Sequence, residues 1–216
     1  MDWILNTFNI ATIFWAVISY LIGAIPFGYL VSRKVKGIDP ATGEPFDIRN
    51  YGSGSTGYAN CKRKLGSKPA LAILIADITK GVVITLIVFL NLFTPLQVAL
   101  VGLLAIIGHC YPIYLGFHGG KGVATACGVL IVINFWAAIL GFAAWKGLSK
   151  KLNISSVGSL FGISVACLVT ILRYLLFKPY PVEYLALVVI ITLFIFYKHK
   201  ENIRRFISGE ENTLSI

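Results

Sequence analysis

A glycine-rich segment, Asn50–Arg63, has the composition of an anion-binding loop. Gly52, Gly54 and Gly57 form a G-x-G-x-x-G pattern, but no βαβ pattern surrounds it, which argues against a dinucleotide site. Glycines let backbone N–H groups approach an anion, and Thr56 is a candidate cap for a short helix whose N-terminus would favour negative charge. Arg63 adds a guanidinium suited to phosphate. The alternative is a flexible loop carrying ordinary cytoplasmic positive charge.

A second segment, Gly116–Thr125, surrounds a lysine with glycines: Gly119 and Gly120 precede Lys121, and Gly122 follows it. A helix is expected to begin directly afterwards, so the segment predicts backbone amides and one cation at a helix N-terminus. It is not a Walker A loop, because a glycine follows the lysine where Ser or Thr is required. A plain inter-helix turn is the alternative, although such a turn does not need three glycines around a lysine.

A third polar segment ends the last apolar run. His199 and Asn202 are three residues apart, and this spacing predicts one shared helix face. The pairs Lys198–Glu201 and Glu201–Arg205 instead suggest an ordinary solvated helix end, so this motif is weak when taken alone.

Other candidates are scattered along the chain. Asp77 and Lys80 lie three apart within an apolar run and can form either a structural ion pair or part of a functional site. Ser156 and Ser159 are candidate helix caps or site hydroxyls, and His109 is a packing or catalytic candidate. The three histidines show no metal-ligand spacing, so no metal is expected. The four cysteines form no Cys-x-x-Cys pair and suggest small apolar residues.

The elements that must position these residues are apolar. The chain has 216 residues, of which 57% are hydrophobic and 13% charged. This composition predicts an all-α, polytopic integral membrane protein, because lipid cannot satisfy unpaired backbone groups. The net charge of +10 is explained by positively charged cytoplasmic loops and anionic lipid, and nucleic-acid binding is not expected. Apolar runs cover about 10–31, 69–93, 96–117, 122–145, 155–177 and 182–197.

Charge fixes the expected topology. The 32–68 loop and the C-terminal tail are rich in Lys and Arg and should both be cytoplasmic, whereas no Lys or Arg precedes the first run. Lys121 and Lys146 at the two ends of the 122–145 run both favour the cytoplasm, so we expect this run to break near Asn134 into a hairpin. The result is about seven helices, one or more of them short or broken, with the N-terminus outside, the C-terminus cytoplasmic, and one domain over 1–216.

The motifs together resemble those of the bacterial acyl-phosphate:glycerol-3-phosphate acyltransferases, the PlsY family. The resemblance is carried by Arg49–Gly54, Asn60–Arg63, Gly108–Thr125 and His199–Ile203. It implies transfer of a fatty acyl group from acyl phosphate to the 1-hydroxyl of glycerol 3-phosphate, giving lysophosphatidic acid and phosphate, the first step of bacterial phospholipid synthesis. It further implies no cofactor, a monomer among membrane lipids, and a cytoplasmic-facing site in the bacterial plasma (inner) membrane.

The resemblance also implies roles for individual residues. Catalytic roles fall to Ser53, Arg63, His199 and Asn202, and a structural role to Glu201. Substrate binding falls to the loop residues Gly52, Gly54, Gly57, Asn60, Gly119, Gly120, Lys121 and Gly122, and more loosely to Ser156 and Ser159.

Two departures from the family pattern keep alternatives open. Ser55 replaces an asparagine and Tyr58-Ala59 replaces Ala-Thr, while residues 38–46 look like an insertion. A paralogue that acylates another acceptor is therefore one alternative. A membrane transporter of organic phosphates, with Asp77 and Lys80 lining a path, is another. A metal-dependent phosphotransferase would need clustered carboxylates, which the sequence lacks.

Overall fold

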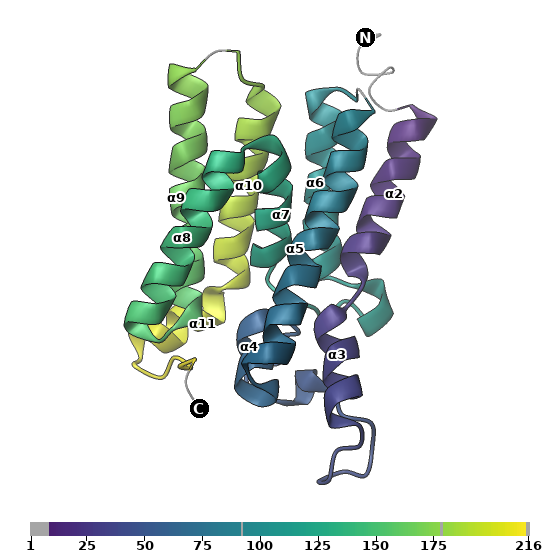
Figure 1. The fold of residues 1–216 in the computed structure, drawn as a ribbon, viewed down its shortest axis with the longest axis vertical. Helices are drawn as coiled ribbons and strands as arrows, with labels where there is room; N and C mark the ends of the chain where they lie inside the picture. Colours follow the sequence, from purple (N-terminus) through teal and green to yellow (C-terminus); the bar gives the residue numbers. More distant parts are fainter. Residues whose placement is uncertain (1–8, 92, 178, 215–216) are drawn as a thin grey trace.

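The computed structural model describes residues 9–91, 93–177 and 179–214, and within them the chain is helical (Figure 1). One isolated β-bridge, Ile38–Pro45, lies in the loop after the second helix. The elements are α2 (Ile10–Ala24), α3 (Phe27–Lys36), η1 (Ile48–Asn50), α4 (Tyr58–Leu65), α5 (Ser67–Leu90), α6 (Pro95–Cys110), η2 (Ile113–Leu115), α7 (Val123–Ile133), α8 (Phe135–Leu152), α9 (Ser155–Leu176), α10 (Val182–Lys198) and α11 (Lys200–Ile207).

The long helices run along the vertical axis of Figure 1, while α3, α4 and α11 lie at its lower end. Four segments are long and apolar enough to cross a membrane: Ile10–Lys36, Ser67–Leu90, Pro95–Leu115 and Ser155–Leu176. The pair α10 and α11, bent by 54°, makes a fifth candidate. The all-helical membrane architecture is thus confirmed, whereas the number of seven spans and the outside N-terminus stay predictions. The first eight residues lie outside the described residues.

The predicted break at Asn134 is present. Asn134 ends α7 and caps α8, its side chain accepting a hydrogen bond from the Ala137 N–H, while its amide donates to Thr170 Oγ1 at 3.1 Å. The eleven residues of α7 rise only about 16 Å, well short of the roughly 30 Å of bilayer hydrocarbon. In Figure 1 the α7–α8 turn accordingly lies below the upper ends of α9 and α10.

Two predicted boundaries were wrong. The first apolar run is interrupted at Pro26, which has no N–H to continue the helix, and α3 then extends to Lys36. The segment 32–68, predicted as a loop, therefore begins inside α3 and contains the whole of α4. Its charged residues are largely helical, which fixes where they point.

Close backbone contacts hold the helices in pairs. A methyl group added to Gly108 of α6 would lie 2.3 Å from the carbonyl oxygen of Tyr20 in α2. At Gly128 of α7 the distance to the Ile78 carbonyl oxygen of α5 would be 2.1 Å, and at Gly162 of α9 it would be 2.7 Å from a carbonyl oxygen of α8. Small residues are the usual means of helix association in lipid, where apolar side chains gain nothing from leaving the solvent.

Candidate active site

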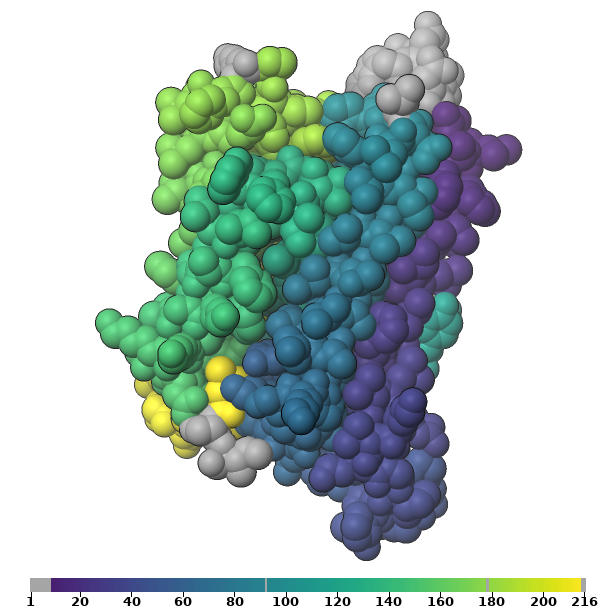
Figure 2. Space-filling model, in the orientation of Figure 1, coloured from purple at the N-terminus to yellow at the C-terminus, as the bar shows by residue number. Residues whose placement is uncertain are grey.

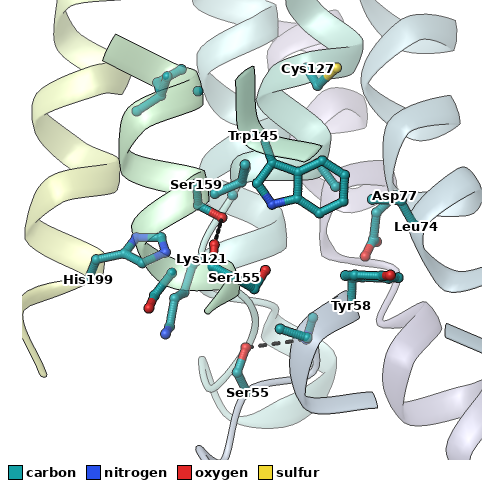
Figure 3. A pocket seen from close by; sticks show the side chains of 18 of the residues that line it. Ser55, Tyr58, Leu74, Asp77, Lys121, Cys127, Trp145, Ser155, Ser159 and His199 are labelled. Atoms are coloured by element: carbon teal, nitrogen blue, oxygen red, sulfur yellow. Dashed lines mark hydrogen bonds between the residues drawn. The ribbon is translucent and has the colours of Figure 1, made fainter. Parts of the chain in front are cut away.

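A pocket opens where α4, α11 and the two glycine loops meet the lower ends of α5, α8 and α9 (Figure 3). Its empty space, counted with the solvent at its open mouth, is about 1090 Å³. Its polar side is lined by Ser53, Ser55, Asn60, Arg63, Asp77, His109, Lys121, Ser155, Ser156, Ser159, His199, Asn202, Glu211 and Asn212. Its apolar side is lined by residues of α5, α7, α8 and α9, so the pocket is charged at one end and apolar at the other.

Asn60 organises the first glycine loop. Its Oδ1 accepts hydrogen bonds from the Ser53 N–H at 3.2 Å and from Arg63 Nη2 at 3.3 Å. Its Nδ2 donates to the carbonyl oxygens of Tyr51 at 2.9 Å and Ser55 at 3.0 Å. Because Asn60 is buried in α4, these bonds tie the loop to that helix and fix Arg63 beside it.

The loop backbone differs from the amide cradle that its composition predicts. The N–H groups of Ser53, Gly54 and Gly57 already donate within the loop, so fewer amides face a ligand. Gly57, and not Thr56, is the N-cap of α4 and lacks a side-chain cap, while Thr56 is buried. Ser53 lines the pocket, and its hydroxyl has no hydrogen bond to another described residue.

Gly52 and Gly54 do not line the pocket; they shape the loop. Both adopt positive φ, 57° and 67°, and a methyl group on Gly52 would lie 2.3 Å from Asn60 Oδ1. Glycine is therefore needed at Gly52 on two separate grounds, backbone conformation and space.

The second loop presents Lys121. The Gly120 N–H donates to the His109 carbonyl oxygen at 3.0 Å, and a methyl group on Gly120 would lie 1.9 Å from His109 Nε2, so the imidazole packs against the loop backbone. Gly122 caps α7 at φ 87° and lines the pocket with Lys121, whereas Gly119 and Gly120 lie behind it. Lys121 Nζ donates a hydrogen bond to Asn202 Oδ1. Burial lowers the pKa of Lys121 to about 8.

His199 and Asn202 do not share one continuous helix face. The chain bends by 54° where α10 ends, and His199 is the residue between α10 and α11. Both side chains are nevertheless buried and line the pocket. His199 Nδ1 lies 2.8 Å from the Ile195 carbonyl oxygen, which can only accept, so Nδ1 carries the proton and a neutral ring keeps its Nε2 lone pair free to accept another.

Glu211 joins the site although the sequence motifs do not mark it. Its carboxylate, 4% exposed, accepts hydrogen bonds from Asn202 Nδ2 at 2.6 Å, Ser156 Oγ at 2.9 Å and Arg205 Nε at 3.0 Å. Arg205 therefore pairs with Glu211 and not with Glu201, which is exposed on α11. The tail carrying Glu211 crosses from α11 back to the α8–α9 turn and orients Asn202 toward Lys121.

The two candidate serines play different parts. Ser156 binds Glu211, as described, while Ser159 Oγ donates to the Ser155 carbonyl oxygen at 2.8 Å (Figure 3). Both line the pocket on α9.

The positive charge of the site is concentrated at its polar end. Arg63 and Lys121 both line the pocket, and Arg205 lies just behind Glu211. Burial lowers the pKa of Arg63, and the nearby Glu211 carboxylate opposes that shift. Asp77 is paired with Lys80, and among the described carboxylates of the pocket Glu211 alone faces Arg63, Lys121 and Arg205, which leaves a net positive potential that suits phosphate groups.

Asp77 and Lys80 form the predicted ion pair, and His109 contacts both of them. Lys80 Nζ lies 2.9 Å from Asp77 Oδ1 and 2.9 Å from His109 Nδ1, and it donates to the Ile25 carbonyl oxygen at 3.2 Å. All three charged or titratable side chains are buried. The cluster ties α2, α5 and α6 together directly behind the loop that carries Lys121.

Among the described residues, no group of three or more His, Cys, Asp or Glu side chains could hold a metal ion.

Comparison with known proteins assigns the family. The family model described as glycerol-3-phosphate acyltransferase matches residues 13–209. The chain belongs to the glycerol-3-phosphate acyltransferase family. The glycerol-3-phosphate acyltransferase of Anaeromyxobacter sp. (strain Fw109-5) is 39% identical over 201 residues, covering 91% of this chain and 93% of the relative. That of Halalkalibacterium halodurans is 40% identical over 201 residues, covering 91% and 92%.

Two solved structures agree with the family assignment. The crystal structure of PlsY, an integral membrane glycerol 3-phosphate acyltransferase, in its glycerol 3-phosphate form has a TM-score of 0.82 and 33% identity, covering 94% of this chain and 95% of PlsY. The lysophosphatidic acid form gives a TM-score of 0.80 and 32% identity over the same shares. The fold of this acyltransferase is therefore that of PlsY over nearly its whole length.

Proposed function

We propose that this chain transfers a fatty acyl group from acyl phosphate to the 1-hydroxyl of glycerol 3-phosphate, giving lysophosphatidic acid and inorganic phosphate. The observation that carries the proposal is the junction at Lys121. This glycine-flanked cation, held by Asn202, lies where a cationic end of the pocket meets an apolar end. Both substrates carry a phosphate, which suits the cationic end of the pocket. The donor also carries an aliphatic chain, which suits the apolar end.

The reaction follows from this placement. The 1-hydroxyl oxygen attacks the acyl carbonyl carbon, an ester bond forms, and the bond from that carbon to the phosphate oxygen breaks. Arg63 and Lys121 offset the repulsion between the two anionic substrates and the charge that develops on the leaving phosphate. Holding the hydroxyl against the carbonyl supplies a large part of the rate. The hydroxyl proton leaves to His199 Nε2 or to the departing phosphate, and a His199→Ala variant separates these routes.

Ser53 has a separate test. If its free hydroxyl binds substrate, Ser53→Ala loses turnover while the protein keeps its folded elution profile and melting temperature. A turn residue alone would leave turnover intact.

We place the polar end of the pocket at the cytoplasmic face of the bacterial plasma membrane. Positive charge supports this assignment, because Lys and Arg of the 32–68 segment and of α11 gather at the end where the pocket opens. Counting α7 and α8 as two passes gives about seven membrane helices, with the N-terminus outside and the C-terminus inside. The chain acts as one domain over 1–216, as a monomer among membrane lipids, and without a cofactor.

The deciding experiment measures phosphate release from palmitoyl phosphate by the purified protein in lipid, with and without glycerol 3-phosphate. The proposal expects release that depends on the acceptor, with lysophosphatidic acid as product. Tyr58 lines the pocket beside the first loop, and this departure favours a second candidate, a paralogue with another acceptor. Release with a different polyol phosphate, and none with glycerol 3-phosphate, would identify the paralogue. Uptake of organic phosphate into vesicles without acyl transfer would support a transporter instead.

A further inference from the structure

Two aromatic side chains meet across the pocket. The rings of Tyr58, the first residue of α4, and Trp145 of α8 are 5.7 Å apart at an interplanar angle of 75°, an edge-to-face contact. Both line the pocket (Figure 3). The helices that carry them are far apart in sequence, and Figure 2 shows atoms of α8 (green) and of α5 (blue) on the same face of the molecule. The contact therefore connects two walls of the pocket.

Trp145 is the fixed member of the pair. A methyl group on Gly162 of α9 would lie 2.9 Å from its Cβ, and one on Gly158 would lie 2.7 Å from its carbonyl oxygen, so α9 packs directly on its backbone. Phe142, one turn earlier on α8, holds the indole with a ring-centroid distance of 5.1 Å. The indole position is thus set by the helix pair α8–α9.

The pair lies at the change from polar to apolar lining. In Figure 3 the indole nitrogen of Trp145 is on the side of the ring turned toward Ser155, Ser159 and Lys121. Within the described residues, neither that nitrogen nor the Tyr58 hydroxyl has a hydrogen-bond partner, so both polar atoms are available beside the anion site.

An apolar channel continues from the pair along α7. Val123, Cys127 and Leu130 are spaced four and three residues apart and line the pocket from one helix face, a length of about 10 Å. The α8 and α9 part of the lining consists of small residues, Ala137, Ala138, Gly141, Gly162 and Ala166.

We propose that the Tyr58–Trp145 pair selects the acyl donor by chain length. The inference rests on the acyl-phosphate reaction proposed above. A donor whose phosphate lies at the cationic end must pass its chain beneath the two rings to reach the α7 channel. A long chain is then covered by the rings, while a chain of two carbons ends before them and gains nothing. Each methylene that loses its cover weakens binding about fourfold, since its burial is worth about 0.8 kcal/mol.

The test compares kcat/KM for palmitoyl, octanoyl and acetyl phosphate at saturating glycerol 3-phosphate. If Trp145→Ala uncovers two or three methylenes of the chain, it should lower the ratio of kcat/KM for palmitoyl phosphate to that for acetyl phosphate by about 15- to 60-fold. Tyr58→Ala shifts the ratio in the same direction, and the double variant falls no further than about twofold below Trp145→Ala, because the two rings act together. Trp136→Ala is the matched control, since Trp136 is on the same helix, is 66% exposed and does not line the pocket.

Trp145→Phe is a second variant in case Trp145→Ala fails to fold. It keeps an aromatic ring at this position and should change the kcat/KM ratio less than Trp145→Ala. Equal losses for all three donors would overturn the proposal and make the pair a structural contact. A change confined to the KM of glycerol 3-phosphate would overturn it too, by placing the pair on the acceptor.

Calorimetric binding of alkyl phosphonates of the same chain lengths needs no turnover. Chain-length-dependent binding that Trp145→Ala abolishes would support the pair even if the wild type failed to transfer an acyl group, so the two proposals fail separately.

Discussion

Replacing Lys80 by methionine removes a buried cation from three partners at once. Its Nζ lies 2.9 Å from Asp77 Oδ1, 2.9 Å from His109 Nδ1 and 3.2 Å from the Ile25 carbonyl oxygen. Side chains of the ion pair are each 3% exposed, so water cannot replace the lost contacts. Breaking one partner of a buried pair costs about 3–5 kcal/mol, because the other charge stays buried alone. Asp77→Leu should cost less, since Lys80 keeps two acceptors.

The double variant Asp77→Leu/Lys80→Met gives the sharper result. It removes both charges and leaves apolar groups of similar size, so its stability should return to within about 1–2 kcal/mol of the wild type. The assay is thermal unfolding of the purified protein in one detergent, where about 3–5 kcal/mol corresponds to roughly 6–20 °C. Lys68→Met, an exposed lysine in the first turn of the same helix, is the control and should shift the free energy of unfolding by less than about 0.5 kcal/mol. Single effects that simply add in the double variant would refute the coupling.

Three further predictions concern the catalytic end. Gly120→Ala places a methyl group 1.9 Å from His109 Nε2, and the resulting shift of the Lys121 loop should lower kcat/KM at least about 100-fold. The control Gly147→Ala, which has no atom within 4 Å, should leave kcat/KM unchanged, and equal activity of the two variants would contradict the packing. Lys121 is charged below its pKa of about 8, so kcat/KM for glycerol 3-phosphate should be constant below pH 8 and fall by up to tenfold per pH unit above it. A kcat/KM that stays constant up to pH 10 would rule out the charge of Lys121 as the group that binds substrate. Glu211→Gln removes the negative charge from three hydrogen bonds and should lower kcat about 10- to 100-fold. The exposed control Glu201→Gln should have a kcat near that of the wild type. A larger loss of kcat for Glu201→Gln than for Glu211→Gln would instead support Glu201, the glutamate to which the family resemblance assigns a structural role.

The helices were predictable where charge and hydropathy gave independent signals. Lys121 and Lys146 at the two ends of one apolar run required an even number of passes, and the only polar residue near its middle, Asn134, marked the turn that the structure has. The length of α7 was not predictable in the same way. Whether eleven apolar residues span, or end within the bilayer, depends on the neighbours that cover the turn.

The motifs indicated several residues of the pocket but not the connections between them. Ser53, Asn60, Arg63, Lys121, His199 and Asn202 all line one pocket, as their motifs predict. The bend at His199 was missed because the residue types around it all suit a continuous helix. Glu211 was missed because it lies in a tail without periodicity, and its bond to Ser156 joins residues 55 apart. Local patterns carry no information on a contact of that separation.

The backbone contacts at Gly108 and Gly128 also limit which substitutions the fold tolerates. Any side chain there would meet a carbonyl oxygen of the neighbouring helix, at 2.3 and 2.1 Å from its first carbon, so one of the two helices would have to move. Gly147, on exposed α8 surface, has open space around it. A side chain at Gly147 would therefore meet no neighbour. At the two packed glycines a side chain would push neighbouring helices apart, and the spacing of the helices around the Lys121 loop would change with it.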